Sequence, residues 1–138
     1  AVVRGVKYEA PRAAPVVLVL SISAGRCSDV VGALRNFDGR CPIARLFGAL
    51  KTKEHASRLE MRLRGSRLLV TTPGRARGLL ERGAFDLHNL RFVVLDMWVD
   101  SKARTMLTMP ETRGDVVSVI QERLLPSEAA PNIKIAYF

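Results

Sequence analysis

The sequence predicts an α/β fold, a three-layer sandwich in which helices cover both faces of a mainly parallel sheet. Short runs rich in Val, Leu and Ile alternate along the chain with amphipathic stretches, which indicates alternating strands and helices. The runs are apolar throughout, as in 16–20, and such strands are typical of a parallel sheet buried on both faces. A length of 138 residues with 48% hydrophobic residues suits one domain with one core.

The N-terminal part differs from the rest of the chain. Residues 1–15 contain Pro11 and Pro15 without hydrophobic periodicity, so we expect an extended lead followed by a domain over 16–138. Within that domain the expected strands are short and apolar, and the expected helices are amphipathic. The expected strands are 16–21, 42–47, 67–71, 91–96 and 133–138, and the expected helices are 29–37, 54–63, 72–82 and 114–124.

The strand 91–96 is expected to be central in the sheet. We expect Val93 to Leu95 to be fully buried there, and we expect Phe92 and Phe138 to be core residues because both fall inside expected strands. Aromatic residues make up only 6% of the chain, which leaves few side chains for stacking on bases. Any contact with RNA is therefore expected to use backbone phosphates and not base sequence.

The charge of the chain makes nucleic acid the first partner to test. Twenty-two Lys and Arg stand against 13 Asp and Glu, which gives a net charge of +9, and 17 of the basic residues are Arg. The planar guanidinium of Arg pairs with phosphate through two parallel hydrogen bonds. An Arg-rich chain therefore suits phosphate binding better than a Lys-rich one does.

Other functional classes have less support in the sequence. No apolar run approaches the roughly 18 residues of a membrane span, and no export leader is visible, so we expect neither a membrane partner nor export. Cys27 and Cys41 form no disulfide framework and suit a reducing compartment. His55 and His88 are isolated, and we expect no metal site, no cofactor and no small-molecule substrate.

Ligands of open α/β sheets collect beyond the carboxyl ends of the strands, and basic residues follow several of the expected strands. The most distinctive of these turns is 72–75, in which Thr is a good N-cap, Pro suits the first helical position and Gly lets a ligand approach. The free amides and the dipole of the helix that follows favour an anion. The alternative that 72–75 only begins a helix has support equal to that for an anion site. The expected contacts with RNA phosphates are Arg26, Lys51, Thr72, Gly74 and Arg75.

Enzymatic chemistry has little support in the sequence. A phosphate loop requires glycines followed by Lys and then Ser or Thr, and the chain contains no such sequence. Asp96 stands at the tip of a strand as a Walker-B carboxylate does, but Met97 follows it where an acid would orient water. A cap of the following turn, or a partner for a base such as Lys102, explains Asp96 better than a metal does. We therefore expect no catalytic residue.

The segment 100–113 is expected to be an exposed, mostly irregular connection, because Pro110 and its neighbours interrupt any helix. It is a candidate surface for docking a partner. An alternative with equal support is that Met106 and Met109 fill the bottom of the core while the basic side chains are solvated. The basic residues expected to contact a partner are Lys102, Arg104 and Arg113.

In order along the chain, these pieces resemble the first RecA-like domain of a DEAD-box RNA helicase. The resemblance consists of the basic turn 21–26, the Gly-containing turn 47–49, the turn 72–75 and the strand end 94–96. The sequence 96–99, Asp-Met-Trp-Val, stands where the helicases have an acidic box, and the phosphate loop is missing. The resemblance therefore implies a RecA-like fold in which Asp96 is a vestige of the acidic motif.

More specifically, residues 16–138 resemble the CMS-type factors of the small-subunit processome, helicase-like proteins of early ribosome assembly. The turn 23–26 leading into a helix and the strand residues 45–47 match this family. The most distinctive match is Asp-Ser-Lys-Ala-Arg-Thr-Met at 100–106, followed by Pro-Glu-Thr-Arg at 110–113. The chain departs from the family's pattern at Ala49 and Leu50, where the family has Lys-His.

This resemblance implies a non-catalytic assembly factor of the early pre-ribosomal particle, located in the nucleolus of the nucleus. Its implied partners are pre-ribosomal RNA or a small nucleolar ribonucleoprotein, together with processome proteins. Two alternatives remain open. One is an RNA-dependent ATPase whose phosphate loop lies upstream, and the other is a RecA-like interaction module of another ribonucleoprotein. ATP binding would distinguish the ATPase from the assembly factor. Cellular location and co-purified RNA would distinguish the interaction module from the assembly factor.

Overall fold

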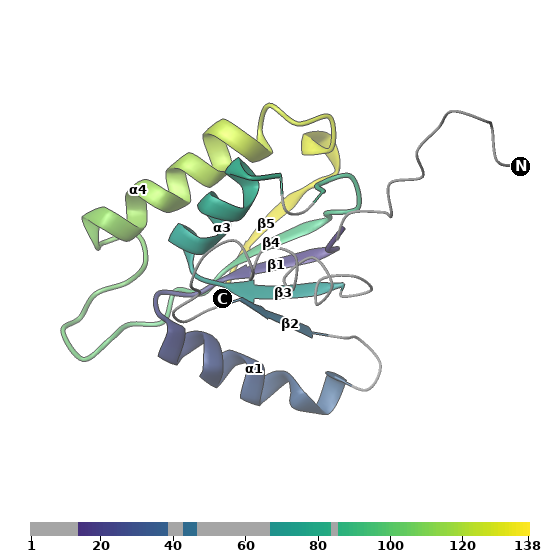
Figure 1. Cartoon of the computed structure of the whole chain (residues 1–138). Coiled ribbons are helices and arrows are strands. Elements are labelled where there is room, and N and C mark those ends of the chain that lie inside the picture. The colour runs from purple at the N-terminus through teal and green to yellow at the C-terminus, as the bar shows by residue number, and fades with distance from the viewer. Residues whose placement is uncertain (1–13, 39–42, 47–66, 84–85) are drawn as a thin grey trace, which may run out of the picture.

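A computed structural model describes residues 14–38, 43–46, 67–83 and 86–138 (Figure 1). They form a five-stranded sheet in the order β2-β3-β1-β4-β5, in which every neighbouring pair is parallel. The predicted parallel sheet is therefore confirmed. The strands are β1 (Val17–Leu20), β2 (Ile43–Leu46), β3 (Leu68–Thr71), β4 (Phe92–Leu95) and β5 (Lys134–Tyr137).

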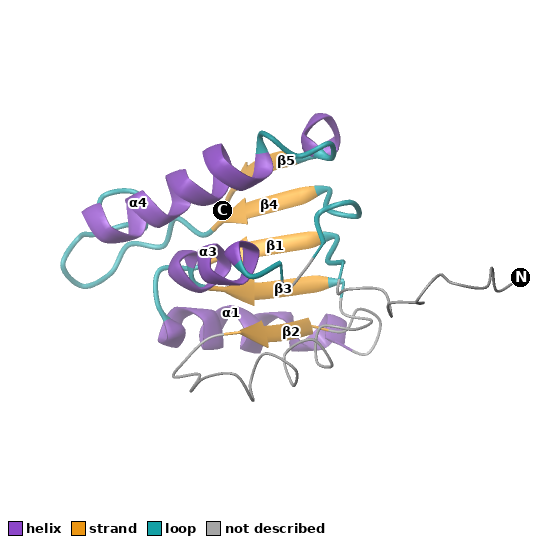
Figure 2. Ribbon diagram, turned by 45° about the horizontal axis from the view of Figure 1, so that its top comes forward, coloured by secondary structure: helices purple, strands orange, loops and turns teal. Residues whose placement is uncertain are grey.

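Helices lie on both faces of the sheet (Figure 2). Helix α1 (Ala24–Asp38) covers one face, and α3 (Pro73–Glu81) and α4 (Pro110–Ser118) cover the other. A π-helical segment, η1 (Val119–Leu124), continues α4, and the 3-10 turn η2 (Ala130–Asn132) precedes β5. The predicted three-layer sandwich is confirmed.

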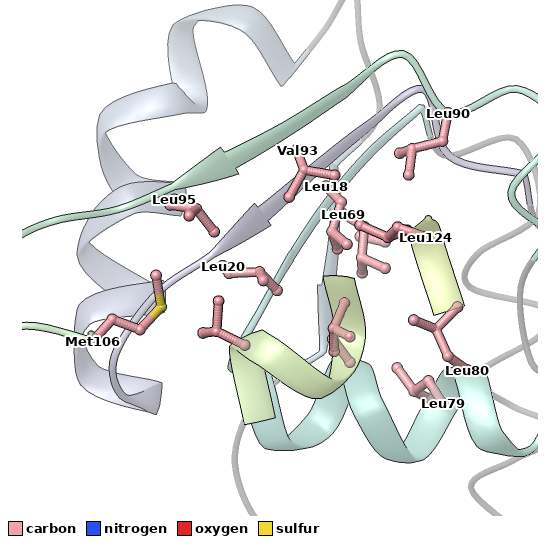
Figure 3. Packing of buried hydrophobic residues seen from close by; sticks show 14 residues of the cluster. Leu18, Leu20, Leu69, Leu79, Leu80, Leu90, Val93, Leu95, Met106 and Leu124 are labelled. Atoms are coloured by element: carbon pink, nitrogen blue, oxygen red, sulfur yellow. The ribbon is translucent and has the colours of Figure 1, made fainter. Parts of the chain in front are cut away.

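The larger part of the core lies between the sheet and the α3–α4 layer (Figure 3). Alternate residues of each strand point to the same face, so every second side chain of β1 and β4 enters this layer. Buried residues from α3, η1 and the connecting segments complete it. The labelled members are Leu18, Leu20, Leu69, Leu79, Leu80, Leu90, Val93, Leu95, Met106 and Leu124.

A smaller cluster lies between the sheet and α1. Val19 and Val70 from the central strands contact Cys27 and Val31 from α1, and all four are buried. The intervening strand positions thus supply the second face, which explains why β1 and β4 are apolar at every position. Cys27 is a core residue, and burial raises the pKa of its thiol to about 11.

Three expected core residues are less buried than predicted. Val93 and Leu95 are buried, but Val94 is only partly buried, Phe92 is 44% exposed and Phe138 is 81% exposed. Phe92 and Val94 face the α1 side of the sheet, where α1 packs mainly on β2 and β3. Phe138 follows β5, an edge strand that is exposed along its length. The prediction of full burial was therefore wrong for Val94, and the prediction of core positions was wrong for Phe92 and Phe138.

Two helices begin earlier than expected. Helix α1 begins at Ala24 and not at 29, and α4 begins at Pro110 and not at 114. Pro110 opens its helix because proline has no amide hydrogen to lose at the first helical position. The segment 100–113 is thus irregular only as far as Met109. The expected helix 54–63 and most of the expected lead 1–15 lie outside the described residues. Among the described helices, none is long and apolar enough to cross a membrane.

Candidate nucleic-acid interface at the strand ends

The carboxyl ends of β1, β3 and β4 meet at one edge of the sheet because these strands are parallel and adjacent. Ser21 follows β1 and donates its amide to the Thr71 carbonyl at 3.0 Å, while the Asp96 amide after β4 donates to the Leu20 carbonyl at 2.9 Å. Ser21, Thr71 and Asp96 are all buried. The strand ends therefore form a tightly joined edge to which the helix-starting turns are attached.

Asp96 is held by Arg26 at this edge. Arg26 Nε donates to Asp96 Oδ2 at 2.7 Å, and Arg26 Nη2 donates to Oδ1 at 3.3 Å. The Asp96 side chain is 2% exposed and that of Arg26 is 21% exposed. The hydrogen bond with Asp96 raises the pKa of Arg26 above its usual value, so the guanidinium stays charged. Both explanations given above for Asp96 are thus observed: it pairs with a base, which is Arg26 and not Lys102, and it accepts a hydrogen bond from the following turn.

Trp98 lies beside this pair. The Arg26 guanidinium carbon is 5.3 Å from the centroid of the Trp98 ring, which is the geometry of a cation–π contact. The Trp98 amide donates to Asp96 Oδ1 at 3.3 Å, so the carboxylate fixes both the guanidinium and the backbone that carries the ring. Trp98 is 41% exposed. Sequence reasoning missed Trp98, although an aromatic residue two positions beyond a strand end could have identified it.

Thr72 and Pro73 begin α3 as the sequence predicted. Thr72 has an extended backbone at the N-cap, and Pro73 stands in the first turn and is buried. Asp115 of α4 faces this helix start: a Cβ atom added to Gly74 would lie 3.1 Å from Asp115 Oδ2. Arg77 Nη1 donates to Asp115 Oδ1 at 3.3 Å. A carboxylate of the protein therefore already lies at the predicted anion site.

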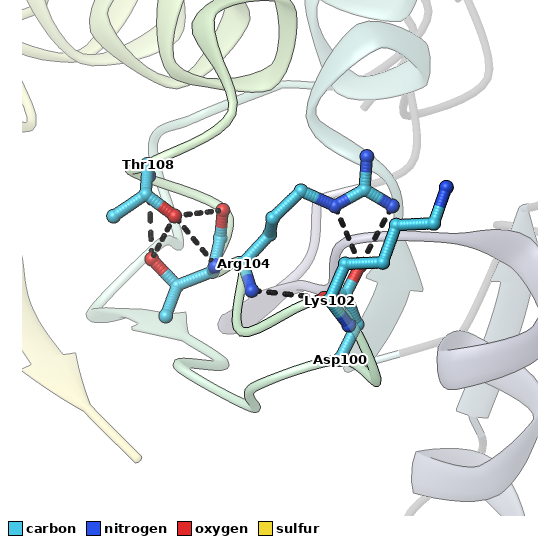
Figure 4. Close-up of polar contacts among 5 residues, drawn as sticks. Asp100, Lys102, Arg104 and Thr108 are labelled. Carbon is cyan, nitrogen blue, oxygen red and sulfur yellow. Dashed lines mark hydrogen bonds and ion pairs between the residues drawn. The ribbon is translucent and has the colours of Figure 1, made fainter.

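The expected docking residues lie on an exposed loop and on α4. Asp100 Oδ1 accepts hydrogen bonds from the amides of Lys102 and Arg104 at 3.0 and 2.8 Å, and Asp100 Oδ2 accepts one from Arg104 Nε at 2.9 Å (Figure 4). The hydrogen bond from the Arg104 amide is the main reason that the pKa of Asp100 lies below its usual value. Lys102, Arg104 and Arg113 are all exposed. Arg113 lies in α4 and not in the loop.

The loop is anchored at its far end. Thr105 and Thr108 exchange hydrogen bonds, among them one from the Thr105 amide to Thr108 Oγ1 at 2.7 Å (Figure 4). Met106 between them is fully buried in the larger core cluster, whereas Met109 is partly buried. The alternative in which both methionines fill the core is therefore correct for Met106 and for the exposed basic side chains, but wrong for Met109. It does not exclude docking, because the basic side chains stay exposed.

The other expected features of the site are Lys51 and the absence of a metal site. Lys51 lies outside the described residues. Within the described ranges, no group of His, Cys, Asp and Glu could hold a metal ion. A shallow pocket of about 410 Å³ lies away from the strand ends and contains none of the expected site residues. Its lining is Leu80, Asp86, Leu87, Glu122, Arg123, Pro126 and Ser127.

The sequence of the chain matches a known protein family over most of its length. A family described as "CMS1: U3-containing 90S pre-ribosomal complex subunit" matches residues 3–134. The chain belongs to the CMS1 family. The CMS1 match confirms the resemblance that rested on the sequence 100–106 and on its continuation at 110–113.

Relatives in the CMS1 family are longer than the chain. Protein CMSS1 of Danio rerio is 32% identical over 125 residues, which are 89% of this chain and 42% of that protein. Protein CMSS1 of Homo sapiens is 28% identical over 134 residues, 96% of this chain and 47% of that protein. Protein CMS1 of Chaetomium thermophilum is 35% identical over 109 residues, 75% of this chain and 43% of that protein. The chain thus spans less than half the length of these CMS1-family proteins.

Among solved structures, the chain is similar to the yeast DEAD-box splicing factor Prp28. The TM-score is 0.64 at 15% sequence identity, and the similarity covers 90% of this chain and 28% of that chain. At this identity the likeness shows the fold alone. The RecA-like architecture predicted for the CMS1-family chain is therefore confirmed.

Proposed function

We propose that the chain is a non-catalytic assembly factor of the U3-containing 90S pre-ribosomal complex, the early nucleolar precursor of the small ribosomal subunit. In this role it is a scaffold that binds RNA and processome proteins and turns over no substrate. The observation that carries the proposal is the ion pair between Asp96 and Arg26 at the tip of β4.

The ion pair occupies the carboxylate at the tip of β4. In nucleotide hydrolases of this fold class, the carboxylate at the strand tip holds the Mg²⁺ that neutralises the phosphates. Both oxygens of Asp96 accept hydrogen bonds from Arg26. A metal would have to displace a guanidinium from a carboxylate that is 2% exposed. Met97 follows Asp96 and has no acid to orient water. These features support a scaffold over the RNA-dependent ATPase.

The basic charge supports RNA as one partner of the scaffold. The chain carries a net charge of +9, and polyanions are attracted to such a chain without sequence selection. The proposed phosphate contacts are those of the strand-end turns at Arg26 and 72–75, with Lys51 beyond the described residues. Asp96 and Asp115 compete with phosphate at these turns. Binding through them is therefore weak and sensitive to salt.

The loop and the start of α4 support protein docking. Lys102, Arg104 and Arg113 are exposed, and Asp100 fixes the backbone on which the first two stand. A preformed loop loses little conformational entropy when a partner binds. We propose that these three residues contact an acidic surface of a processome protein or ribonucleoprotein.

Two measurements on the full-length protein test the proposed function. RNA-stimulated phosphate release from ATP should not exceed that of the Asp96→Ala variant, and Met97→Glu should not raise it. Release above this control would support the ATPase. Crosslinking of RNA in the tagged protein, purified from cells, should recover pre-ribosomal RNA or a small nucleolar RNA. Recovery of RNA from another ribonucleoprotein alone would support the interaction module instead.

A further inference from the structure

An exposed aromatic ring stands at the edge where open α/β sheets bind their ligands. Trp98 is 41% exposed and follows the carboxyl end of β4. A large aromatic side chain left this exposed gives up much of the stabilisation that burial would supply. Trp98 is the single tryptophan of the chain. Trp98 is not among the proposed phosphate contacts.

The ring is held in place before any ligand arrives. Asp96, which is buried, binds the Arg26 guanidinium at 2.7 Å, and the guanidinium carbon lies 5.3 Å from the ring centroid. The Trp98 amide donates to the same carboxylate at 3.3 Å. One side of the ring is thus backed by a fixed cation, and the exposed remainder can receive a second flat group. A ring that is already positioned costs less entropy on binding than a mobile one.

The chemistry of this arrangement selects a flat, electron-rich or neutral group attached to an anion. An unpaired nucleobase on a phosphate backbone has both properties, because every base offers a π-face and the chain carries a net charge of +9. An acidic peptide would also be attracted by the charge, but it need not bring a planar group to the ring. The observations therefore favour RNA over a protein ligand at Trp98.

We propose that Trp98, backed by Arg26, is a stacking platform for one unpaired base of a single-stranded RNA segment. Asp96 is a positioning residue, because it orients Arg26 and the Trp98 backbone without touching the base. This proposal rests on the RNA binding in the proposed function and adds a base contact to it. Stacking is indifferent to base identity, so the platform selects unpaired over paired RNA and not one sequence over another.

The single tryptophan makes its own fluorescence the probe. The 138-residue chain, which contains this one tryptophan, is titrated with an unstructured oligouridylate and with an abasic oligomer of the same length, and total binding is followed separately by anisotropy of a label on the RNA. We expect oligouridylate to quench Trp98 at the concentrations at which it binds. The abasic oligomer should bind more weakly and leave the fluorescence unchanged.

Substitutions provide the second arm. Trp98→Ala should weaken oligouridylate binding roughly tenfold, whereas Trp98→Phe should keep most of the affinity because it retains a ring. Phe92→Ala is the matched control, because Phe92 is similarly exposed at 44% but lies at the opposite end of β4. This control should bind as the wild type does. The quenching measurement needs no variant and stands even if one of them folds poorly.

The outcomes separate the two proposals. If oligouridylate binds but neither quenches Trp98 nor distinguishes Trp98→Ala, the stacking platform is wrong while RNA binding stands. If no RNA binds at all, the platform and the RNA part of the proposed function both fail. If RNA does not bind but Trp98→Ala releases the protein from its particle, Trp98 is a protein contact and the stacking proposal is again wrong.

Discussion

At the scale of single residues, the loss of Arg26 alone should destabilise the fold more than the loss of both Arg26 and Asp96. Asp96 is 2% exposed, so removal of Arg26 leaves a buried carboxylate without its countercharge. We expect Arg26→Ala to lower the free energy of unfolding by about 3 kcal/mol, measured by urea denaturation. The double variant Arg26→Ala with Asp96→Ala should recover part of this loss, because no uncompensated charge remains.

Arg77→Ala is the control for the loss of an arginine as such. Its partners Glu81 and Asp115 are partly exposed, and solvent screens both contacts. The variant should unfold close to the wild-type midpoint. If Arg26→Ala did the same, the pair would contribute no more than a surface contact.

Asp100 makes the loop before α4 sensitive to acid. Hydrogen bonds, chiefly from the Arg104 amide, lower the pKa of Asp100 in the folded protein. A lowered pKa means that the stabilisation is fully present above the ordinary Asp range and is lost as the pH falls through the lowered value. The amide proton shifts of Lys102 and Arg104 should therefore titrate together at a pH below about 3.9. In Asp100→Asn these shifts should not follow the pH, and a flat wild-type profile would contradict the assignment.

At the scale of elements, the two faces of β4 should respond differently to a buried charge. Val93 is fully buried in the larger core cluster, whereas Val94 is partly buried on the α1 side. We expect Val93→Asp to cost several kcal/mol and prevent folding, because an unpaired carboxylate would lie in the core. Val94→Asp should be milder and retain cooperative unfolding. Equal effects in thermal denaturation would contradict the alternation of faces described for this strand.

Asp115 of α4 lies beside the start of α3. Its carboxylate lies near Gly74 and binds Arg77, so it places a negative charge close to where the helix start would attract a phosphate. Asp115→Asn should raise affinity for single-stranded RNA and steepen the log–log salt dependence by about 0.7, the slope of one added phosphate contact. Glu111→Gln removes the same charge from the exposed first turn of α4 and is the control. Equal gains in both variants would indicate a general charge effect.

The elements could be predicted from the sequence because their causes are local. Four apolar residues in a row specify β1 and β4, and Thr72 with Pro73 specifies the start of α3. The start of α4 was misplaced because Pro110 was interpreted as a break, although proline both interrupts and begins helices. The partial exposure of Val94 depends on which strands α1 covers, and the strand sequence carries no information on that.

The candidate site could be predicted only in part because its contacts are not local. Arg26 and Asp96 were each identified, but 70 positions separate them, and only the folded sheet brings them together. The same holds for Gly74 and Asp115, which belong to different helices. The ordering of Trp98 on Arg26 depends on this long-range ion pair. Residue types at strand ends therefore indicated the location of the site but not which charges neutralise one another.

At the scale of the whole molecule, the positive charge is unevenly distributed. Thirteen of the 22 Lys and Arg and ten of the 13 Asp and Glu lie in the described ranges. The described part therefore carries +3 of the net +9, and the other segments carry the rest. Most of the non-specific attraction to RNA is thus expected from residues outside the sheet and helices described above.

Retention in the pre-ribosomal particle should depend on the position of basic residues and not only on their number. We expect the triple variant Lys102→Ser, Arg104→Ser and Arg113→Ser to leave the particle fraction in sucrose-gradient sedimentation while remaining folded. The control replaces three exposed bases near the opposite edge of the sheet and has the same net charge. Undiminished co-sedimentation of the first variant would show that the loop and α4 do not dock the partner. The control substitutions are Arg82→Ser, Arg91→Ser and Lys134→Ser.

The strand order has a consequence for how the protein is made. β1 is the first of the described strands along the chain but lies third in the sheet, where it pairs with β3 on one side and β4 on the other. Leu20 meets its partner Leu95 only after the intervening 74 residues have been synthesised, which takes about 4 to 15 seconds at 5–20 residues per second. During that interval the side of β1 that pairs with β4 has no partner strand, even after β3 has been synthesised. A factor with this topology should need a chaperone at the ribosome exit more than a helical bundle of equal length does.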